Sequence, residues 1–492
     1  MAENNKKMIL RVLVIGLLAL IGTNLVTYYL AAGQARQSSA KDEPTVIKYE
    51  PPRRDSNEEL MVVQEALNTI TEYYFSPVEK EVLIEGALRG MIDSIGDPQV
   101  RFFDPEELEE FMTDTQGSYS GIGVRIVESN GRIVVFEVFP DSPAQRSGLT
   151  PGDFLLEADG NELTDQGVSR AVELLRGPSS VPVEVLIKRP GADEPIKFNV
   201  DRAEIKVATV FSEMLDDGLG YIRISSFDSS TASEFSSQFR EMEKRGLGVG
   251  LILDLRNNPG GLVDQAVEVA KLLVPEGEIV RLVGRDGEVS NTYYSSAAKK
   301  PYPIVVLINE DSASSSELLA GALQDRNAAL LVGKTTYGKA SVQQLANLTG
   351  GSGILLTIAR YFTPSGHDIH EHGIEPDFEV EMPEILLYYN YFFPDSLEQD
   401  DYGFEVEMLQ LMLDQIGFPV EASGYFDLST SIALTNFQIA SGLPGSGKFD
   451  DLTWVELREA LDLAARDNDE QLNYALEMIR KPGLWTITGD RD

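Results

Sequence analysis

A serine and a lysine, Ser314 and Lys339, are the first residues whose types and spacing could support chemistry. Ser314 lies in DSASSSELLAGAL (residues 311–323), and Lys339 lies in TTYGKASVQQL (residues 335–345). A serine hydroxyl is a weak nucleophile that needs a nearby base. Lysine can act as that base when burial lowers its pKa. Gln343 follows four residues later, and its amide could orient the lysine without adding a charge that would hold the proton there.

The segment around Ser314 offers free backbone amides as well as a hydroxyl. A buried strand is predicted at residues 304–308, and a helix is predicted to begin at Ser314. Helix N-termini present unpaired N–H groups and a partial positive charge, which can stabilise the oxyanion of an acyl-transfer intermediate. The same residues fit a capping box, Ser314-x-x-Glu317, in which the serine only starts the helix. On the pattern alone, a helix cap and a surface lysine are the commoner interpretations.

Two further stretches bear on this chemistry. LILDLRNNPGGL (residues 251–262) indicates a buried strand that ends in a Gly-Gly turn. A backbone amide there could approach a ligand closely and act as a second oxyanion donor, although an ordinary Pro-Gly turn is the alternative. GHDIHEH places His367, His370 and His372 within six residues, which could bind a metal or supply a catalytic base. The Gly-rich, acidic surroundings favour solvated side chains, so we predict no metal and no cofactor.

Alternating strands and helices must position these residues. From residue 204 onward, apolar runs such as GLILDLR, PIVVLIN and AALLVG alternate with helical runs at 262–273 and 314–325. This pattern predicts a layered α/β core over 204–385. Residues 117–203 are mostly β in pattern. Residues 57–116 carry apolar residues at i, i+3 and i+4 and predict a helical arm, which is either a hairpin packed on the body or a dimer contact.

The composition excludes several classes of function. The 492-residue chain has 41 basic and 79 acidic residues, and its net charge of −38 repels a phosphate backbone, so we expect no nucleic acid partner. The absence of cysteine excludes disulfides, a thiol nucleophile and a lipidated N-terminal cysteine. A chain of this length exceeds one ordinary core and favours about three domains.

The N-terminus predicts a membrane anchor. Basic residues in a cytoplasmic tail (1–11) precede an uncharged apolar run at 12–33 that is long enough to span a bilayer. A cleaved signal peptide is the alternative, but its apolar region is usually shorter. A polar, Pro-rich linker follows at 34–56. We therefore expect a single-pass protein of the bacterial cell membrane, with its catalytic part extracytoplasmic.

Four motifs, in this order and spacing, resemble the carboxy-terminal processing (tail-specific) serine peptidases: NNPGGL, DSASSSELLAGALQDR, YGKASVQ and LTIARYFTPSGHDIHEHGIEPD. The resemblance covers about residues 57–385. It implies a Clp-protease/crotonase-like α/β core and a serine endopeptidase with a Ser-Lys dyad. Carried over by motif, Ser314 would be the nucleophile, Lys339 the general base and Gln343 its assistant.

The same resemblance implies an oxyanion hole made by the backbone amides of Gly260 and Ser315. The chain departs from the family pattern at Ser315, where alanine is usual, and at Ala340, where glycine is frequent. Neither change should alter the chemistry, because the first position needs only a backbone amide and the second only a small side chain.

Residues 117–203 resemble bacterial PDZ domains through SYSGIGVRI (118–126) and FPDSPAQRSGLTPGDFLLEADGNEL (139–163). Such domains add an extended peptide as a strand and hold its C-terminal carboxylate on backbone N–H groups. The helix predicted at 166–176 would form the other wall of the groove. The implied substrates are proteins or peptides with apolar C-termini. The implied carboxylate loop consists of Gly121, Ile122, Gly123 and Val124.

Residues 402–464 resemble a three-helix peptidoglycan-binding domain, joined to the core by a linker at 386–401 and followed by a tail at 465–492. GYFDLST (424–430) and GKFDDLT (447–453) repeat the pattern G-x-F-D-x-x-T, and each threonine is expected to cap a helix. A small helical domain without affinity for glycan is the alternative.

Together these observations predict a membrane-anchored, extracytoplasmic serine endopeptidase that selects protein substrates by their C-terminal tails. The resembled family often forms dimers through helical arms, so we expect a homodimer, with peptidoglycan as a further partner. The alternative is a catalytically silent scaffold that recruits partners through its PDZ and wall-binding modules. A hydrolase that uses the histidines or a metal is a third hypothesis.

Overall fold

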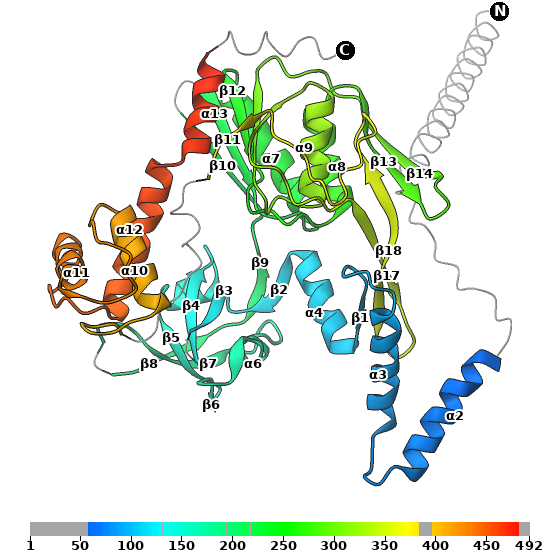
Figure 1. Ribbon diagram of the computed structural model, residues 1–492, viewed down its shortest axis with the longest axis horizontal. Helices are drawn as coiled ribbons and strands as arrows, with labels where there is room; N and C mark the ends of the chain where they lie inside the picture. Colours follow the sequence, from blue (N-terminus) through cyan, green and yellow to red (C-terminus); the bar gives the residue numbers. More distant parts are fainter. Residues whose placement is uncertain (1–57, 130, 193, 216–217, 383–395, 482–492) are drawn as a thin grey trace, which may run out of the picture. The chain divides into compact units, whose positions relative to one another are not determined.

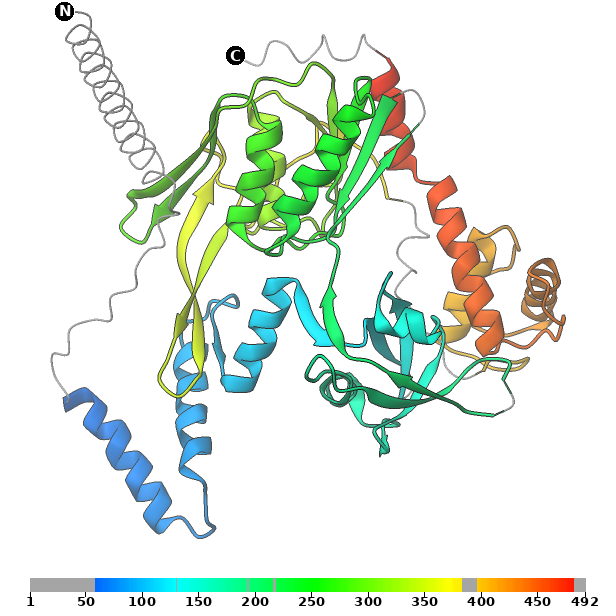
Figure 2. The same ribbon diagram turned by 180° about the vertical axis from the view of Figure 1, so that it is seen from behind.

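The structure, a computed structural model, describes most of the chain between its two ends (Figure 1, and from behind in Figure 2). The predicted cytoplasmic tail, membrane anchor and first linker, residues 1–56, lie outside the described residues. Within the part that is described, no helix is both long and apolar enough to cross a membrane. The described residues are 58–129, 131–192, 194–215, 218–382 and 396–481.

The chain divides into two compact units, residues 1–76 and 77–492. The described part of the first unit is the helix α2 (Glu58–Tyr73), whose apolar side chains Leu60 and Met61 are exposed. All other elements below belong to the second unit.

The second unit begins with helices, as the apolar repeat predicted. Helix α3 (Lys80–Asp93) ends before Gly96, which has a φ of 73° that favours glycine. A short strand, β1 (Arg101–Phe103), then pairs antiparallel with strand β18 of the core and buries Phe102 and Phe103. Helix α4 (Pro105–Gln116) follows. The β1 pairing fixes the turn after α3 against the core.

The next region is the mostly β domain that the sequence predicted. Its sheet has the order β3-β4-β5-β7-β8, and alternate residues such as Val183 and Val185 are buried while Glu184 is exposed. The strands β2 (Ser118–Gly121) and β9 (Ala203–Lys206) pair where the chain enters and leaves the domain. The other elements are β3 (Val124–Ser129), β4 (Arg132–Val138), α5 (Pro143–Ser147), β5 (Phe154–Ala158), β6 (Asn161–Glu162), α6 (Gly167–Leu175), β7 (Val183–Lys188) and β8 (Ile196–Val200).

A six-stranded sheet forms the centre of the α/β core. Its order is β10-β11-β12-β15-β16-β19, and every neighbouring pair except β10 and β11 is parallel. Its central strands β12, β15 and β16 are short and buried along their whole length, as expected for a parallel sheet that is covered on both faces. The six strands are β10 (Val210–Met214), β11 (Leu219–Ile224), β12 (Gly250–Asp254), β15 (Ile304–Ile308), β16 (Leu330–Gly333) and β19 (Phe378–Glu379).

Three helices cover one face of this sheet (Figure 2). Leu253 and Val306 of the sheet pack in one cluster with Phe239, Val267 and Leu319, which come from the three helices. The helices are α7 (Thr231–Lys244), α8 (Val263–Leu273) and α9 (Ser315–Asp325).

The opposite face is covered by α13 (Glu470–Arg480), which lies in the stretch expected to be a tail. Ile252 and Val305, which point away from α7 to α9, pack with Met478 and Ile479 of α13. A parallel sheet needs cover on both faces, and here the last described helix supplies it. The expected tail therefore contains an element of the core.

An ion pair fixes the start of α13. Arg256 follows β12 and contacts Asp254 at 2.6 Å and Asp469, the N-cap residue of α13, at 2.8 Å. All three side chains are at most 9% exposed. Burial would raise the pKa of Asp254, but the charge and hydrogen bonds of Arg256 lower it, so the carboxylate stays ionised.

A second, antiparallel sheet lies beside the parallel one in the core. Its order is β1-β18-β13-β14, and β17 also pairs with β18. A bulge in β18, where Ile358 has no partner between Val342 and Gln343 of β17, leaves Gln343 opposite Thr357. The strands are β13 (Gly277–Gly284), β14 (Val289–Ser295), β17 (Ser341–Asn347) and β18 (Gly353–Phe362).

Three helices form the last domain around a core that includes Leu409, Phe426 and Phe437. The repeated G-x-F-D-x-x-T pattern forms two equivalent turns, each held by a buried glutamine, Gln410 or Gln438, which accepts from a glycine N–H and donates to a threonine hydroxyl. The helices are α10 (Phe404–Gln415), α11 (Leu428–Ala440) and α12 (Asp451–Asp467).

The prediction that each threonine of this repeat caps a helix is wrong. The side chains of Asp427 and Asp450 are the N-caps, and each accepts from the N–H of the threonine three residues later, Thr430 or Thr453. A carboxylate accepts this hydrogen bond with a full charge beside the helix N-terminus.

The packing of α13 predicts that Met478→Ala destabilises the whole core. The side chain is 1% exposed, and removing it leaves a cavity that should lower the free energy of unfolding by about 2–5 kcal/mol. Chemical denaturation measures this change. Asn473→Ala, at an exposed position of the same helix, is the matched control and should be nearly neutral. Equal stability of the two variants would contradict the assignment of α13 to the core.

Candidate active site

Ser314 stands at the junction of β15 and α9 in a strained backbone conformation. Its φ is 53° and its ψ is −113°, a region that residues other than glycine rarely adopt. The neighbouring loop accommodates this conformation because it has glycine at position 260. A Cβ at Gly260 would lie 2.7 Å from the Ser314 Cβ and 2.9 Å from the Ser315 nitrogen. The predicted Gly-Gly turn therefore contacts Ser314 directly.

The other serines of the cluster bind this loop. The hydroxyls of Ser312, Ser315 and Ser316 donate to the carbonyls of Leu255, Gly261 and Asn258 at 2.8–2.9 Å. Three of the four hydroxyls are thus used to join α9 to the segment after β12. Among the described residues, the hydroxyl of Ser314 makes no hydrogen bond to this loop, which separates it from its neighbours.

Glu317 begins α9 together with Ser314, as the capping box that their spacing predicted. Its carboxylate is fully buried and accepts from the N–H of Ser314 at 2.8 Å. It also accepts from the N–H groups of Lys339 at 2.8 Å and Gly338 at 2.7 Å, and from the Thr336 hydroxyl at 2.5 Å. One carboxylate therefore connects the backbone of the serine to the backbone of the lysine.

Tyr361 of β18 makes a second connection between the same two segments. Its buried hydroxyl lies 2.7 Å from the carbonyl of Ser314 and 3.0 Å from the carbonyl of Lys339, so one O–H is shared by the two. Its N–H donates to the carbonyl of Ala340 at 2.9 Å. Burial, and then the charge of Glu317, raises the pKa of Tyr361, so the hydroxyl remains a donor.

Lys339 is half buried beside these contacts. Burial lowers the pKa of its ammonium, and the carboxylates of Asp97 and Glu317 act against that lowering. No hydrogen bond joins the Lys339 ammonium to the Ser314 hydroxyl in the described part of the chain. The structure brings the two backbones together and leaves the two side chains unpaired with each other.

Gln343 does not contact Lys339 through a hydrogen bond among the described residues. Its amide nitrogen donates to the hydroxyl of Thr357 at 3.4 Å, and Thr357 donates to the carboxylate of Asp97 at 2.8 Å. Asp97 is a residue that sequence reasoning missed. Its local pattern, Gly96-Asp97-Pro98, signals only the turn that ends a helix.

The two predicted oxyanion donors, the N–H groups of Ser315 and Gly260, differ in whether they already have a hydrogen-bond acceptor. Ser315 N–H is at the first position of α9, and the described residues offer it no hydrogen-bond acceptor. Gly260 N–H donates to the side-chain oxygen of Asn258 at 2.9 Å. The Gly260 amide therefore lies next to Ser314 but must exchange this partner before it can bind an oxyanion.

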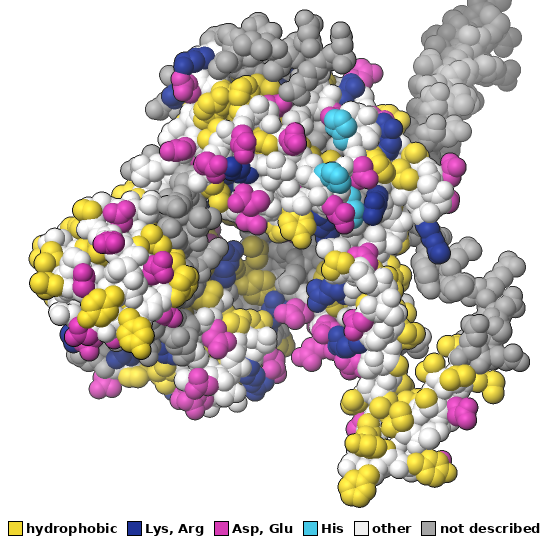
Figure 3. Space-filling view, viewed as in Figure 1, with side chains coloured by type: hydrophobic (Ala, Val, Ile, Leu, Met, Phe, Trp, Pro, Cys, Tyr) yellow, Lys and Arg dark blue, Asp and Glu magenta, His cyan; other side chains and the backbone are white. Residues whose placement is uncertain are grey.

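The three histidines lie on the surface of the α/β core (Figure 3), two of them on either side of Glu371. The N–H of Glu371 donates to the carbonyl of Gly338, next to Lys339, at 2.8 Å. The Nδ1 atom of His372 lies 2.6 Å from the carbonyl of His370. Within the described residues, no group of three or more potential ligands is arranged to hold a metal ion.

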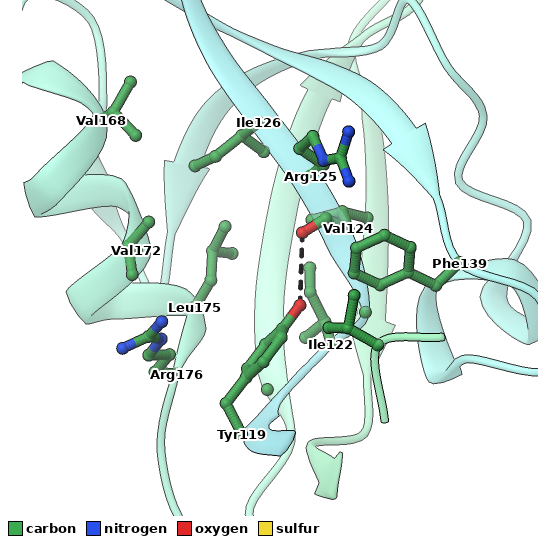
Figure 4. A pocket seen from close by; sticks show the side chains of 13 residues that line it. Tyr119, Ile122, Val124, Arg125, Ile126, Phe139, Val168, Val172, Leu175 and Arg176 are labelled. Atoms are coloured by element: carbon green, nitrogen blue, oxygen red, sulfur yellow. Dashed lines mark hydrogen bonds between the residues drawn. The ribbon is translucent and has the colours of Figure 1, made fainter. Parts of the chain in front are cut away.

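A groove of about 290 Å³ lies between β3 and α6 of the mostly β domain (Figure 4). All four predicted loop residues, Gly121 to Val124, line it. The side chain of Tyr119 extends into the groove, and its hydroxyl lies 3.5 Å from the carbonyl of Val124. Arg176 stacks on the Tyr119 ring at 5.2 Å. Burial raises the pKa of Tyr119 to about 12, so its hydroxyl donates. The apolar walls are Ile122, Ile126, Val168, Val172 and Leu175.

Comparisons with known families match four stretches of the chain. The model of peptidase family S41 matches residues 218–380, and the model of the activating protease CtpB N-terminal domain matches residues 20–107. The PDZ domain model matches residues 111–188. A model of domains described as peptidoglycan binding matches residues 403–457. The matches at 111–188, 218–380 and 403–457 fall on the mostly β domain, the α/β core and the three-helix domain, respectively.

Two relatives from Bacillus subtilis (strain 168) cover most of the chain. The carboxy-terminal processing protease CtpB is 32% identical over 424 residues, which is 85% of this chain and 88% of that protein. This chain belongs to peptidase family S41. The carboxy-terminal processing protease CtpA is also 32% identical, over 85% of this chain and 90% of that protein. A solved photosystem II D1 C-terminal processing protease is 30% identical over 67% of this chain and 95% of that chain, with a TM-score of 0.42. The family models and the two Bacillus subtilis relatives together show that the S41 chain is a C-terminal processing serine peptidase with a PDZ domain.

The geometry predicts that Glu317→Gln inactivates this S41 peptidase. A neutral amide cannot accept all four donors, and its own NH₂ would face some of them. We expect the free energy of unfolding to fall by about 1–3 kcal/mol for each donor left unsatisfied. Displacement of the two segments should reduce kcat roughly 100-fold. Cleavage of an unfolded protein substrate and thermal unfolding measure the two effects.

The matched control for this prediction is Glu371→Gln. The chemical change is the same, but the Glu371 side chain is exposed, so kcat and stability should stay near those of the parent protein. Full activity of Glu317→Gln would show that the carboxylate does not hold the site together.

Proposed function

We propose that this peptidase cleaves protein substrates with Ser314 as nucleophile and Lys339 as general base. One observation supports this most: two buried side chains, Glu317 and Tyr361, each bind the backbones of both Ser314 and Lys339. In addition, among the described residues the hydroxyls of Ser312, Ser315 and Ser316 bind the neighbouring loop, whereas the Ser314 hydroxyl makes no bond to it.

The proposed reaction begins when neutral Lys339 accepts the proton of the Ser314 hydroxyl. The serine oxygen attacks the substrate carbonyl carbon, and the resulting oxyanion faces the Ser315 N–H at the start of α9. The carbon–nitrogen bond then breaks, and the protonated lysine gives its proton to the leaving amine. Water hydrolyses the acyl-enzyme by the reverse sequence, with Lys339 again accepting a proton.

The Gly260 amide would join this reaction as a second oxyanion donor after it leaves Asn258. Gln343 would assist through its amide oxygen, because its NH₂ group already donates to Thr357. Both roles require only side-chain or local backbone adjustment around Ser314, which is consistent with the loose geometry of hydrogen bonds in unliganded active sites.

Substrate selection is assigned to the PDZ groove. A substrate tail would add as a strand to β3, and its terminal carboxylate would bind the N–H groups of the Gly121–Val124 loop. Apolar walls favour an apolar terminal residue. Gly123 has a φ of 85°, and a Cβ there would lie 2.3 Å from the Ser142 Cβ, so this loop needs glycine.

The remaining expectations concern location and assembly. The apolar run at 12–33 supports a single membrane anchor with the peptidase outside the cytoplasm. Exposed apolar side chains on α2, yellow in Figure 3, support a homodimer formed by the arm. The match at 403–457 supports peptidoglycan as a partner. Membrane fractionation tests the anchor, and recovery of the protein in the soluble fraction would overturn it. Sedimentation of the purified protein tests the homodimer, and a monomer would overturn it. Binding to purified cell wall tests the peptidoglycan proposal, and a protein that stays unbound would overturn it.

Substitution of the dyad tests the proposed chemistry. Ser314→Ala and Lys339→Ala should each abolish cleavage of an unfolded protein substrate, followed by gel electrophoresis. Lys334→Ala is the matched control, because Lys334 is a nearby lysine that pairs with Glu379 at 3.0 Å and should be dispensable. Cleavage by both dyad variants would sink the proposal and favour the histidine or metal hypothesis. If the parent protein and both variants all fail to cleave the substrate, the result favours the catalytically silent scaffold.

The same proposal predicts the direction of the pH dependence. Lys339 must be neutral to accept a proton, so kcat/KM should rise with pH as Lys339 deprotonates. Burial lowers the pKa of Lys339, so this rise should occur at a lower pH than an exposed lysine would give. A pH-rate profile measures it, and a profile that falls with increasing pH across this range is incompatible with a lysine base.

Tyr119→Ala should increase the affinity of the PDZ groove for a tail peptide several-fold. The change removes the ring from the groove and frees the carbonyl of Val124, which an added strand would use. Fluorescence anisotropy with a peptide ending in an apolar residue measures the affinity, and the same peptide with a C-terminal amide is the control ligand. Tyr294→Ala, at an exposed tyrosine of β14, is the control variant. Weaker binding by Tyr119→Ala would instead make Tyr119 part of the binding site.

A further inference from the structure

Asp97 lies in the turn between α3 and β1 and is held there by hydrogen bonds. One carboxylate oxygen accepts from the N–H of Gln99 at 2.8 Å, and the other accepts from the hydroxyl of Thr357 at 2.8 Å. The pairing of Arg101 with Leu355 in β1 and β18 places the turn beside Thr357. The position of Asp97 is therefore set by main-chain pairing as well as by its own contacts.

Thr357 transmits the orientation of Asp97 to Gln343. A hydroxyl has one hydrogen, and in Thr357 it is donated to Asp97. The oxygen of Thr357 can therefore only accept from Gln343, which turns the NH₂ group of Gln343 toward Thr357. The amide oxygen of Gln343 is left to accept a hydrogen bond from elsewhere, as a group that assists an ammonium must.

Asp97 also acts on Lys339 through its charge. Among the described residues, the charged groups that influence the lysine are Asp97 and Glu317, with Asp97 the larger. The carboxylate of Glu317 is occupied by four donors, and the hydroxyl of Tyr361 remains neutral. Among the described residues, the carboxylate of Asp97 accepts from two donors, the N–H of Gln99 and the hydroxyl of Thr357.

We propose that Asp97 is a positioning residue of the Ser-Lys site: it directs the Gln343 amide through Thr357, and its negative charge retains the proton on Lys339. The proposal rests on the dyad proposed above. Its consequence is that Asp97 raises the pH at which the peptidase becomes active. Because Asp97 belongs to the turn after α3, a displacement of that turn would change the protonation of the base.

The test compares two variants in the full-length protein. Asp97→Asn removes the charge but keeps an oxygen that can accept from Thr357, and the rising limb of the kcat/KM profile should shift to lower pH. At a pH on that limb, the variant should cleave several-fold faster than the parent. Thr357→Val keeps the charge and removes the hydroxyl, so the limb should stay in place while kcat falls several-fold.

Lys339→Ala separates this proposal from the proposed function. If Lys339→Ala still cleaves, the dyad and the role of Asp97 both fall. If Lys339→Ala is inactive and the limb of Asp97→Asn is unmoved or shifts to higher pH, the dyad stands and the role of Asp97 falls. If thermal unfolding shows that Asp97→Asn does not fold, Asp97→Ser, which keeps an acceptor for the Gln99 N–H, gives the same comparison.

Discussion

The buried carboxylate of Glu317 is the interaction on which the site depends. It accepts four hydrogen bonds, one from the turn of Ser314 after β15 and three from the segment Thr336 to Lys339 after β16. A buried charge is costly unless its oxygens are fully bonded, whereas each hydrogen bond to a charged group contributes roughly 1.5–3 kcal/mol. The same charge opposes the lowering of the Lys339 pKa. The carboxylate thus holds the two residues in place and at the same time makes the Lys339 ammonium harder to deprotonate.

The four serines of the cluster have different structural roles. Glu317 accepts from the N–H of Ser314 in a capping box, and the hydroxyls of Ser312, Ser315 and Ser316 bind the loop after β12. Ser314 is left with an unusual backbone conformation against Gly260. Strain of this kind persists only where the surrounding structure determines it, and here both the loop and the carboxylate do so.

The elements of the core are not continuous in the sequence. The three-helix domain lies between β19 and α13, and both of these elements belong to the parallel sheet layer. The domain that matches peptidoglycan-binding proteins is therefore inserted into the core rather than added after it. Its return to the core passes through Asp469, whose partner Arg256 directly precedes the Asn257–Gly261 loop. The position of this domain and the loop beside Ser314 share one buried ion pair.

The sequence by itself determined the alternation of strands and helices, the β pattern of the PDZ domain, and the motifs that contain Ser314, Lys339 and Gln343, because these depend on local periodicity and short spacing. Tertiary structure alone decided that Asp97 meets Thr357, 260 positions away, that α13 covers the sheet, and that Tyr119 extends into the groove, where Arg176 stacks on it. Each of these contacts joins segments whose local patterns signal only a turn, a tail or a strand. Partners of this kind are chosen by the packing of the whole chain, and a local pattern carries no record of them.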